Sequence, residues 1–170
     1  MNTPTQSVES STVDPQSAES ESSALDSSTP LMQAEPGPVA HRCDVLIADD
    51  TGASREILSA LLRQFCPGVA IREARDGASA LNAWRQWKPR VTFLDIDMPG
   101  MDGLTVLKSI RAEQADVFVA MVSGHSSADN VRLALSTGAS GFIVKPFKPQ
   151  RVVDVLERYR RLSGHALVDG

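Results

Sequence analysis

Two patterns of hydrophobic and polar residues alternate along residues 43–163. Short apolar runs are typical of strands covered on both faces, and they predict strands at 43–48, 69–74, 90–95, 117–122 and 141–144. The stretches between them space their apolar residues three and four apart, which predicts helices at 55–65, 76–87, around 104–111, 127–137 and 149–162. The run at 69–74 alternates most clearly, so we expect an edge strand there.

Apolar stripes in the predicted helices indicate which side chains face a core. The first stripe is Ile57, Leu58, Leu61, Leu62 and Phe65; the second is Ala80, Leu81 and Trp84; the third helix carries Leu104, Leu107, Lys108 and Arg111; and the fourth carries Val131 and Leu135. Pro149 stands at the start of the last helix, where its missing N–H costs little.

Strict alternation of strands and helices predicts an α/β fold with five strand–helix pairs, a parallel sheet and helices on both faces. About 130 residues bury roughly two-thirds of their unfolded surface, enough for an independent core. We therefore expect one domain over residues 43–163 and a short tail over 164–170.

Charge is spread unevenly along the 170 residues. Residues 1–40 carry six acids and no Lys or Arg, whereas fifteen acids and seventeen bases fall in residues 41–170. Residues 1–42 are rich in Ser, Thr and Pro and lack aromatic side chains, a composition typical of a disordered acidic tail. The tail is available for partner binding or for phosphorylation on Ser or Thr.

Several classes of protein are disfavoured by these patterns. The tail lacks the basic start and apolar stretch of a secretory signal, and no run approaches a membrane span. A body so nearly balanced in charge gives no case for nucleic-acid or membrane binding. Cys43 and Cys66 are too few for a disulfide framework or a zinc site. We expect a cytoplasmic protein with two buried or half-buried thiols.

Polar side chains follow the predicted strands at the ends where a parallel sheet places functional groups. Asp49 and Asp50 follow the first strand, Asp95 ends the third, Ser123 follows the fourth and Lys145 follows the fifth. Singly, an Asp there is often a helix cap and a Ser is often a turn residue. Their joint appearance at several strand ends favours a shared site.

The chemistry of this set points to phosphoryl transfer. Carboxylates within reach of one another repel, and a divalent cation with oxygen ligands removes that repulsion, which suits Mg²⁺. Lys145 can pair with a carboxylate or an incoming anion, and Ser123 can donate a hydrogen bond to that anion. A carboxylate can then attack phosphorus and become an acyl phosphate. No Gly-rich nucleotide loop and no Ser-His-Asp order is present.

Four motif blocks in order resemble the response-regulator receiver domain of two-component signalling, the CheY-like superfamily. They are Asp49-Asp50, LDIDMPGMDG at 94–103, MVSG at 121–124 and GASGFIVKPF at 138–147. The resemblance covers about residues 44–162. It implies a doubly wound, flavodoxin-like sheet of strand order 2-1-3-4-5.

The resemblance implies a role for each matching residue. Asp95 is the expected phosphoacceptor, and Asp49, Asp50, Asp95 and the backbone carbonyl of Asp97 are expected to hold Mg²⁺. Ser123 and Lys145 are expected to contact the phosphoryl group, with a cis bond between Lys145 and Pro146. Phe142 is the expected switch aromatic that rotates inward when Ser123 moves.

Two further residues are expected to tune hydrolysis. By the resemblance, Asp97 and His125 occupy the variable positions beside the phosphoryl group, where a histidine is able to change charge near neutral pH. Phe142 lacks the hydroxyl of Tyr, so its inward and outward states differ by packing alone. Pro99 and Gly100 are predicted to turn the chain, and Asp102 is predicted to cap the third helix.

The resemblance implies a stand-alone receiver that accepts a phosphoryl group from a histidine kinase or a histidine phosphotransfer protein. Such a receiver is expected to catalyse only its own phosphorylation and dephosphorylation, so it is not expected to be an enzyme in the usual sense. Its output is expected to be a protein–protein contact. The expected surface spans the fourth helix, fifth strand and fifth helix and includes Arg132, Phe142, Arg151, Val152, Val155 and Arg158.

Two alternatives remain. A phosphorelay intermediate would pass its phosphoryl group on through the face around Ser54, Arg55 and Leu58. A small Mg²⁺-dependent aspartyl-phosphate phosphatase is the other, since Asp97 supplies a second acid two residues after Asp95. The MPGMDG and KPF blocks argue against that phosphatase.

Overall fold

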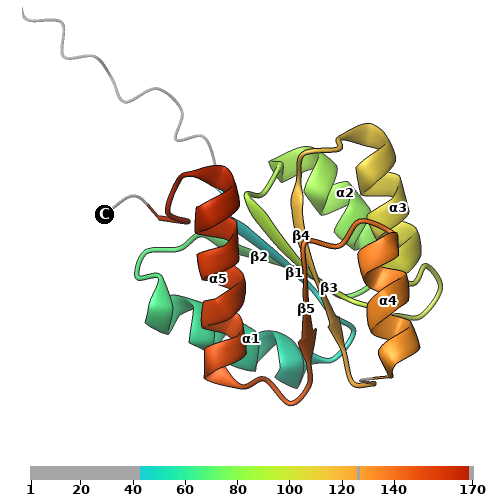
Figure 1. Ribbon diagram of the computed structural model, residues 1–170, viewed down its shortest axis with the longest axis horizontal. Coiled ribbons are helices and arrows are strands. Elements are labelled where there is room, and N and C mark those ends of the chain that lie inside the picture. The colour runs from blue at the N-terminus through green and yellow to red at the C-terminus, as the bar shows by residue number, and fades with distance from the viewer. Residues whose placement is uncertain (1–42, 126, 169–170) are drawn as a thin grey trace, which may run out of the picture. The chain divides into compact units, whose positions relative to one another are not determined.

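A computed structural model describes residues 43–125 and 127–168 of the chain, and the predicted tail over residues 1–42 lies outside this range. Strands and helices alternate throughout (Figure 1). The elements are β1 (Val45–Ala48), α1 (Gly52–Phe65), β2 (Ile71–Ala74), α2 (Gly77–Trp87), β3 (Val91–Asp95), α3 (Gly103–Glu113), β4 (Phe118–Ser123), α4 (Ala128–Ser136), β5 (Gly141–Val144) and α5 (Pro149–Ser163).

The five strands form one parallel sheet of order β2-β1-β3-β4-β5, which confirms the predicted fold. The predicted edge strand is β2. Helices α1 and α5 cover one face, and α2, α3 and α4 cover the other (Figure 1). The central strands β1, β3 and β4 are buried along their whole length, as expected for strands between two helical layers.

Successive residues of a strand pack alternately into the two hydrophobic cores. In β1, Val45 and Ile47 join the core under α1 and α5, while Leu46 and Ala48 join the core under α2 and α3. Side chains point alternately to the two faces of a strand, so a strand that is apolar throughout contributes to both cores. The C-terminal end of the described chain also reaches a core, because Leu167 is buried beside α5.

Helix ends are fixed largely as the sequence predicts. The Asp102 carboxylate accepts a hydrogen bond from the Thr105 N–H at 2.7 Å, so Asp102 caps α3. Pro149 begins α5. Gly100 has a φ of 78°, a left-handed turn conformation that favours glycine.

Two predicted stripes are only partly correct. Ile57 lies on the outside of α1, 52% exposed, although Leu58 and Leu62 beside it are buried. Leu133 and Leu135 of α4 are about half exposed, and Ala134 is the buried residue of that helix. Small Ala134 lets α4 approach the core, and the larger leucines on either side remain outside.

The start of α3 passes against the end of β3 at very short range. A Cβ atom added to Gly103 would lie 2.0 Å from the backbone oxygen of Asp95 and 3.0 Å from the Cα of Ile96. The Gly103 N–H donates to the Ile96 carbonyl at 3.0 Å. Glycine at this position is therefore required by the packing that holds the end of β3.

We predict that Gly103→Ala destabilises the protein, because the new methyl group meets backbone atoms that cannot rotate away. Overpacking of this kind costs about 1–3 kcal/mol of unfolding free energy, and more where backbone must shift. Urea unfolding followed by far-UV circular dichroism measures the loss. The matched control is Gly124→Ala, where an added Cβ meets nothing within 4 Å. Equal stability of the two variants contradicts the prediction.

Candidate phosphoryl-transfer site

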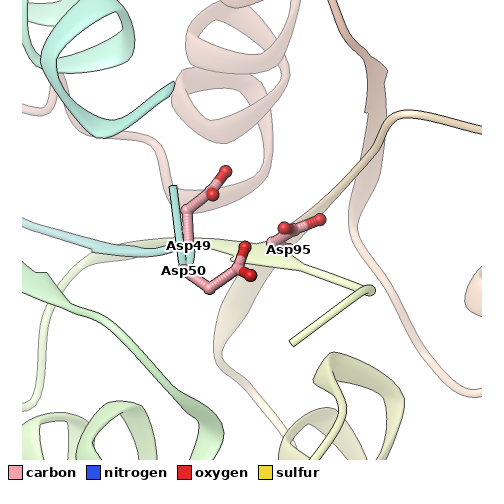
Figure 2. Close-up of side chains that lie close together, drawn as sticks. All are labelled: Asp49, Asp50 and Asp95. Atoms are coloured by element: carbon pink, nitrogen blue, oxygen red, sulfur yellow. The ribbon is translucent and has the colours of Figure 1, made fainter. Parts of the chain in front are cut away.

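Three carboxylates meet at the carboxyl edge of the sheet. Asp49 and Asp50 follow β1, and Asp95 ends β3, the strand paired with β1. One oxygen of each lies within 4.8 Å of the others, and Figure 2 shows the three side chains close together. Asp49 and Asp95 are each only 2% exposed, whereas Asp50 is exposed. The structure thus brings together the three acids that the sequence analysis singled out.

Lys145 joins this cluster from the end of β5. Its Nζ lies 2.6 Å from Asp49 Oδ2 and 3.2 Å from Asp95 Oδ2. The Lys145 N–H donates to the Ser123 carbonyl at 2.8 Å, which fixes the backbone just before the cis bond to Pro146. One ammonium therefore bridges the two buried carboxylates.

The electrostatics of Asp95 follow from its burial. Loss of water raises the pKa of Asp95 to about 6, and the Asp49 carboxylate acts in the same direction, while Lys145 opposes both. Burial alone would lower the pKa of Lys145, but its hydrogen bond to Asp49 and the charge of Asp95 raise it. One ammonium does not fully compensate the acids packed here.

The donor set fits a hard divalent cation. The three carboxylates offer oxygen atoms alone, at a spacing that lets one ion contact all of them. Because Asp50 is exposed, water can complete the coordination, as Mg²⁺ prefers. Burial is the main cause of the raised pKa of Asp95, and the neighbouring Asp49 carboxylate adds to it; such an ion neutralises the charge of both carboxylates.

Ser123 and Phe142 lie on β4 and β5, the next two strands after that of Asp95 in the sheet. Ser123 is fully buried at the end of β4, and its hydroxyl accepts a hydrogen bond from the His125 N–H at 3.0 Å. Phe142 is half-buried in β5 and packs against the core that contains Met121, its partner on β4. Both residues stand where the resemblance placed them, and their roles stay predictions.

Asp97 and His125 form a pair above the site. His125 Nδ1 lies 3.4 Å from Asp97 Oδ2, and both side chains are exposed. The Asp97 N–H points back toward Asp95 Oδ1 at 3.4 Å. These two residues, predicted to tune hydrolysis, thus meet each other at the rim of the cluster.

One supporting network was missed by the sequence analysis. Arg55 of α1 donates from Nη1 to the backbone oxygen of Asp49 at 2.9 Å and pairs through Nε with Glu73 of β2 at 3.0 Å. Ser59 donates to the same Glu73 at 3.2 Å. The signal was an Arg six residues after Asp49, but the register of β2 had to be known before Glu73 could be matched to it.

Parts of the two predicted contact surfaces are wrong. Val152 is fully buried, and Val155 is 6% exposed, because both face the sheet from α5. On α1, Leu58 is 1% exposed, so it is unavailable to a partner, and Arg55 is engaged with Glu73. The apolar side chains that the α4–β5 surface does expose are Leu133, Leu135 and Val144.

Comparison with known proteins agrees with this geometry. Residues 45–157 match the family model described as the response regulator receiver domain. The chain is 35% identical over 120 residues to the chemotaxis protein CheY of Bacillus subtilis, covering 71% of this chain and 98% of that protein. It is 36% identical over 118 residues to the DNA-binding response regulator MtrA of Mycobacterium tuberculosis, covering 69% of this chain but only 50% of that protein.

Solved structures show the same architecture. The receiver domain of NtrX from Brucella abortus is 37% identical, with a TM-score of 0.61 over 69% of this chain and 98% of that chain. The chemotaxis protein CheY4 of Vibrio cholerae is 28% identical, with a TM-score of 0.63 over the same shares. Within the described part of the chain, no helix has the length and apolar character that a membrane crossing needs.

We predict that Asp95→Asn stabilises the fold at pH 7 when no divalent cation is present. The pKa of Asp95 is about 6 in the folded protein and ordinarily about 4, so the folded state loses stability as pH rises from about 4 to about 6. Asparagine removes this charge, and we expect a gain of about 2–3 kcal/mol at pH 7 that vanishes below pH 4. Urea unfolding across this pH range measures it.

The control with the opposite sign is Asp102→Ala. It removes the cap of α3 and costs about 0.5–2 kcal/mol of unfolding free energy at pH 7. An Asp95→Asn variant no more stable than the parent protein at pH 7 contradicts the prediction.

Proposed function

Because the chain belongs to the response regulator receiver domain family of two-component signalling, we propose that it is a stand-alone receiver phosphorylated on Asp95. The phosphoryl donor is a histidine kinase or a histidine phosphotransfer protein. The observation that carries the proposal is the position of Asp95, a buried carboxylate at a strand end with Asp49, Asp50 and Lys145 around it. The chain acts on no separate substrate and catalyses only its own phosphorylation and dephosphorylation.

The transfer uses the Asp95 carboxylate as nucleophile. A carboxylate oxygen forms the new bond to phosphorus while the bond from phosphorus to the imidazole nitrogen of the donor breaks. The electron pair of that bond stays on the imidazole, and Asp95 becomes an acyl phosphate. A pKa of about 6 leaves Asp95 mostly ionised at neutral pH, which a nucleophile requires.

Mg²⁺ would be held by the carboxylates of Asp49, Asp50 and Asp95 and by the backbone carbonyl of Asp97. When bound, it offsets the negative charge of the acids and of the phosphoryl oxygens. Lys145 then exchanges its contact with Asp95 for the incoming phosphoryl group and keeps its 2.6 Å contact with Asp49.

Ser123 and Phe142 would transmit the event. Ser123 turns its hydroxyl from the His125 N–H to the phosphoryl group, and the space it vacates lets Phe142 rotate inward. The two strands are directly paired, with Met121 opposite Phe142, which supports this coupling. Phosphorylation thereby shifts a pre-existing equilibrium between two arrangements.

The output surface would be that of α4, β5 and α5. Exposed Leu133, Leu135 and Val144 supply apolar contacts, which a partner can cover. Arg132, Arg151 and Arg158 are exposed on the same elements and favour an acidic partner in the cytoplasm. The chain then signals through a phosphorylation-dependent protein contact.

Acetyl phosphate tests the proposal. With Mg²⁺, we expect one phosphoryl group per chain by intact-protein mass spectrometry, and none in Asp95→Asn. Asp50→Asn slows the reaction because it removes one ligand of the ion. The matched control Asp102→Asn keeps the cap of α3 and leaves the stoichiometry unchanged. Phosphorylation of Asp95→Asn, or sustained turnover of phosphomonoesters, disproves the receiver assignment.

The lifetime of the acyl phosphate should depend on the Asp97–His125 pair, since both side chains border the path that water takes to phosphorus. We expect His125→Ala and Asp97→Asn each to change the dephosphorylation rate several-fold. Decay after removal of acetyl phosphate, followed by phosphate-affinity electrophoresis, gives the rate. Asp129→Asn on exposed α4 serves as control. Unchanged lifetimes in both variants exclude a tuning role.

A further inference from the structure

Arg55 and Glu73 lie beside the carboxylate cluster without belonging to it. Arg55 is close to the start of α1, and its guanidinium reaches back to the strand that precedes this helix. Nη1 donates to the backbone oxygen of Asp49 at 2.9 Å, while Nε pairs with Glu73 at 3.0 Å. The Arg55 side chain is only 14% exposed. The guanidinium therefore links the end of β1 to the neighbouring strand β2 through contacts that are largely shielded from water.

The contact with Arg55 completes the fixation of Asp49. The Asp49 N–H donates to the Ala74 carbonyl at 3.1 Å, and Oδ1 accepts from the Thr51 N–H at 2.8 Å. Oδ2 lies 2.6 Å from Lys145 Nζ, and the backbone oxygen is the atom that Arg55 holds. Each polar atom of Asp49 thus has a partner of its own, and Arg55 supplies the one that fixes the orientation of the peptide group.

Asp50 depends on this peptide group more than the other two acids do. Peptide planarity ties the Asp49 oxygen to the Asp50 N–H, so a guanidinium that holds one orients the other. The Asp50 side chain is exposed, with the Thr51 hydroxyl donating to its Oδ1 at 3.3 Å, whereas Asp49 and Asp95 are buried. Packing therefore restrains the Asp50 carboxylate least. The backbone orientation that Arg55 sets then decides how close this carboxylate lies to the other two.

Glu73 gives Arg55 both its orientation and its charge balance. Glu73 is paired with Ile47 in the register of β2 on β1, two residues before Asp49. Its Oε1 accepts from the hydroxyl of buried Ser59 at 3.2 Å, which leaves Oε2 for Arg55. An uncompensated guanidinium would place a positive charge where a cation is expected to bind, and it would weaken that binding. Paired with Glu73, Arg55 can orient Asp49 while adding little net charge.

We propose that Arg55 and Glu73 are positioning residues of the cation site. Arg55 orients the peptide group between Asp49 and Asp50 so that both carboxylates can contact one ion, and Glu73 acts through Arg55. The inference rests on the proposed function only in taking Mg²⁺ as that ion. Replacing such partners of metal ligands typically lowers the affinity for the metal by about 10–100-fold.

Two simpler roles for the Arg55–Glu73 pair give different outcomes. If the pair only ties α1 to β2, its loss changes stability and leaves the affinity for Mg²⁺ unchanged. If only charge matters, Arg55→Gln strengthens Mg²⁺ binding because it removes a positive charge, and Glu73→Gln weakens it. Positioning requires both variants to weaken the binding.

Titration of the unphosphorylated chain with Mg²⁺ tests the proposal. The amide signals of Asp50 and Asp95 in NMR spectra give the dissociation constant. We expect Arg55→Gln to raise this constant about tenfold, and Glu73→Gln to raise it less but in the same direction. The double variant should match Arg55→Gln alone, because Glu73 acts through Arg55. Arg55→Lys should not restore the affinity, since an ammonium lacks the planar fork that reaches both partners.

A spectroscopic signature and a matched ion pair make the test specific. Without Mg²⁺, the carbonyl ¹³C signal of Asp49 should shift in Arg55→Gln, because that oxygen loses its donor. The control is the pair of Arg85 and Glu113, 2.8 Å apart, in the last turn of α2 and at the end of α3. Arg85→Gln and Glu113→Gln remove an ion pair of the same kind. They should leave the Asp49 signal and the dissociation constant unchanged.

Three results overturn the proposal. One is an Arg55→Gln variant that binds Mg²⁺ as tightly as the parent chain or more tightly. Another is an equal loss of affinity in the Arg85 and Glu113 variants. The third is the absence of saturable Mg²⁺ binding at Asp50 in the parent chain. If Arg55→Gln fails to fold, Glu73→Gln decides alone, and an unchanged affinity in that variant overturns the proposal.

The titration uses no phosphoryl donor, so it fails independently of the proposed function. A chain that binds Mg²⁺ as described but gains no phosphoryl group from acetyl phosphate refutes the receiver assignment and leaves the positioning role standing. A chain that is phosphorylated on Asp95, while Arg55→Gln binds Mg²⁺ like the parent, refutes the positioning role alone.

Discussion

The double ion pair of Lys145 with Asp49 and Asp95 is the interaction on which the site depends. Two carboxylates that are 2% exposed would be prohibitively costly without a counter-charge, and Lys145 is the cation that contacts both. Lys145 reaches them only because β5 is aligned on β4, where Ser123 accepts its backbone N–H. The charge balance of the site therefore depends on the order of the strands and on their register.

Much of this constraint was readable from the sequence. Buried parallel strands show as apolar runs, and their carboxyl ends must share one edge, so Asp49, Asp95 and Lys145 could be grouped before any coordinates. The cap by Asp102 was equally local, since it joins residues three apart. Predictions held wherever the decisive contact was set by the chain's local geometry or by the sheet's direction.

The predictions that were wrong, and the contacts that were not predicted, share a different cause. A helical stripe identifies apolar residues but not how deeply a helix sits, so Ile57 and Leu135 were predicted to face the core although both are exposed. Fully buried Val152 was assigned to the surface by the same confusion. The Arg55–Glu73 contact and the close approach at Gly103 depend on the tertiary packing of neighbouring elements, which periodicity does not encode.

Phe142 connects the two halves of the proposed function. It is opposite Met121 on β4, two residues before Ser123, and it also lines a cavity between β5 and α5. In the proposed switch, a phosphoryl group that draws Ser123 away and a partner that covers Phe142 would thus act on one side chain. Linkage then requires reciprocity: whatever factor phosphorylation applies to the affinity of a partner for the surface of α4, β5 and α5, the binding of that partner applies to the phosphorylation equilibrium. An inward Phe142 would leave less apolar surface exposed there, so a partner that covers Phe142 should favour the unphosphorylated state.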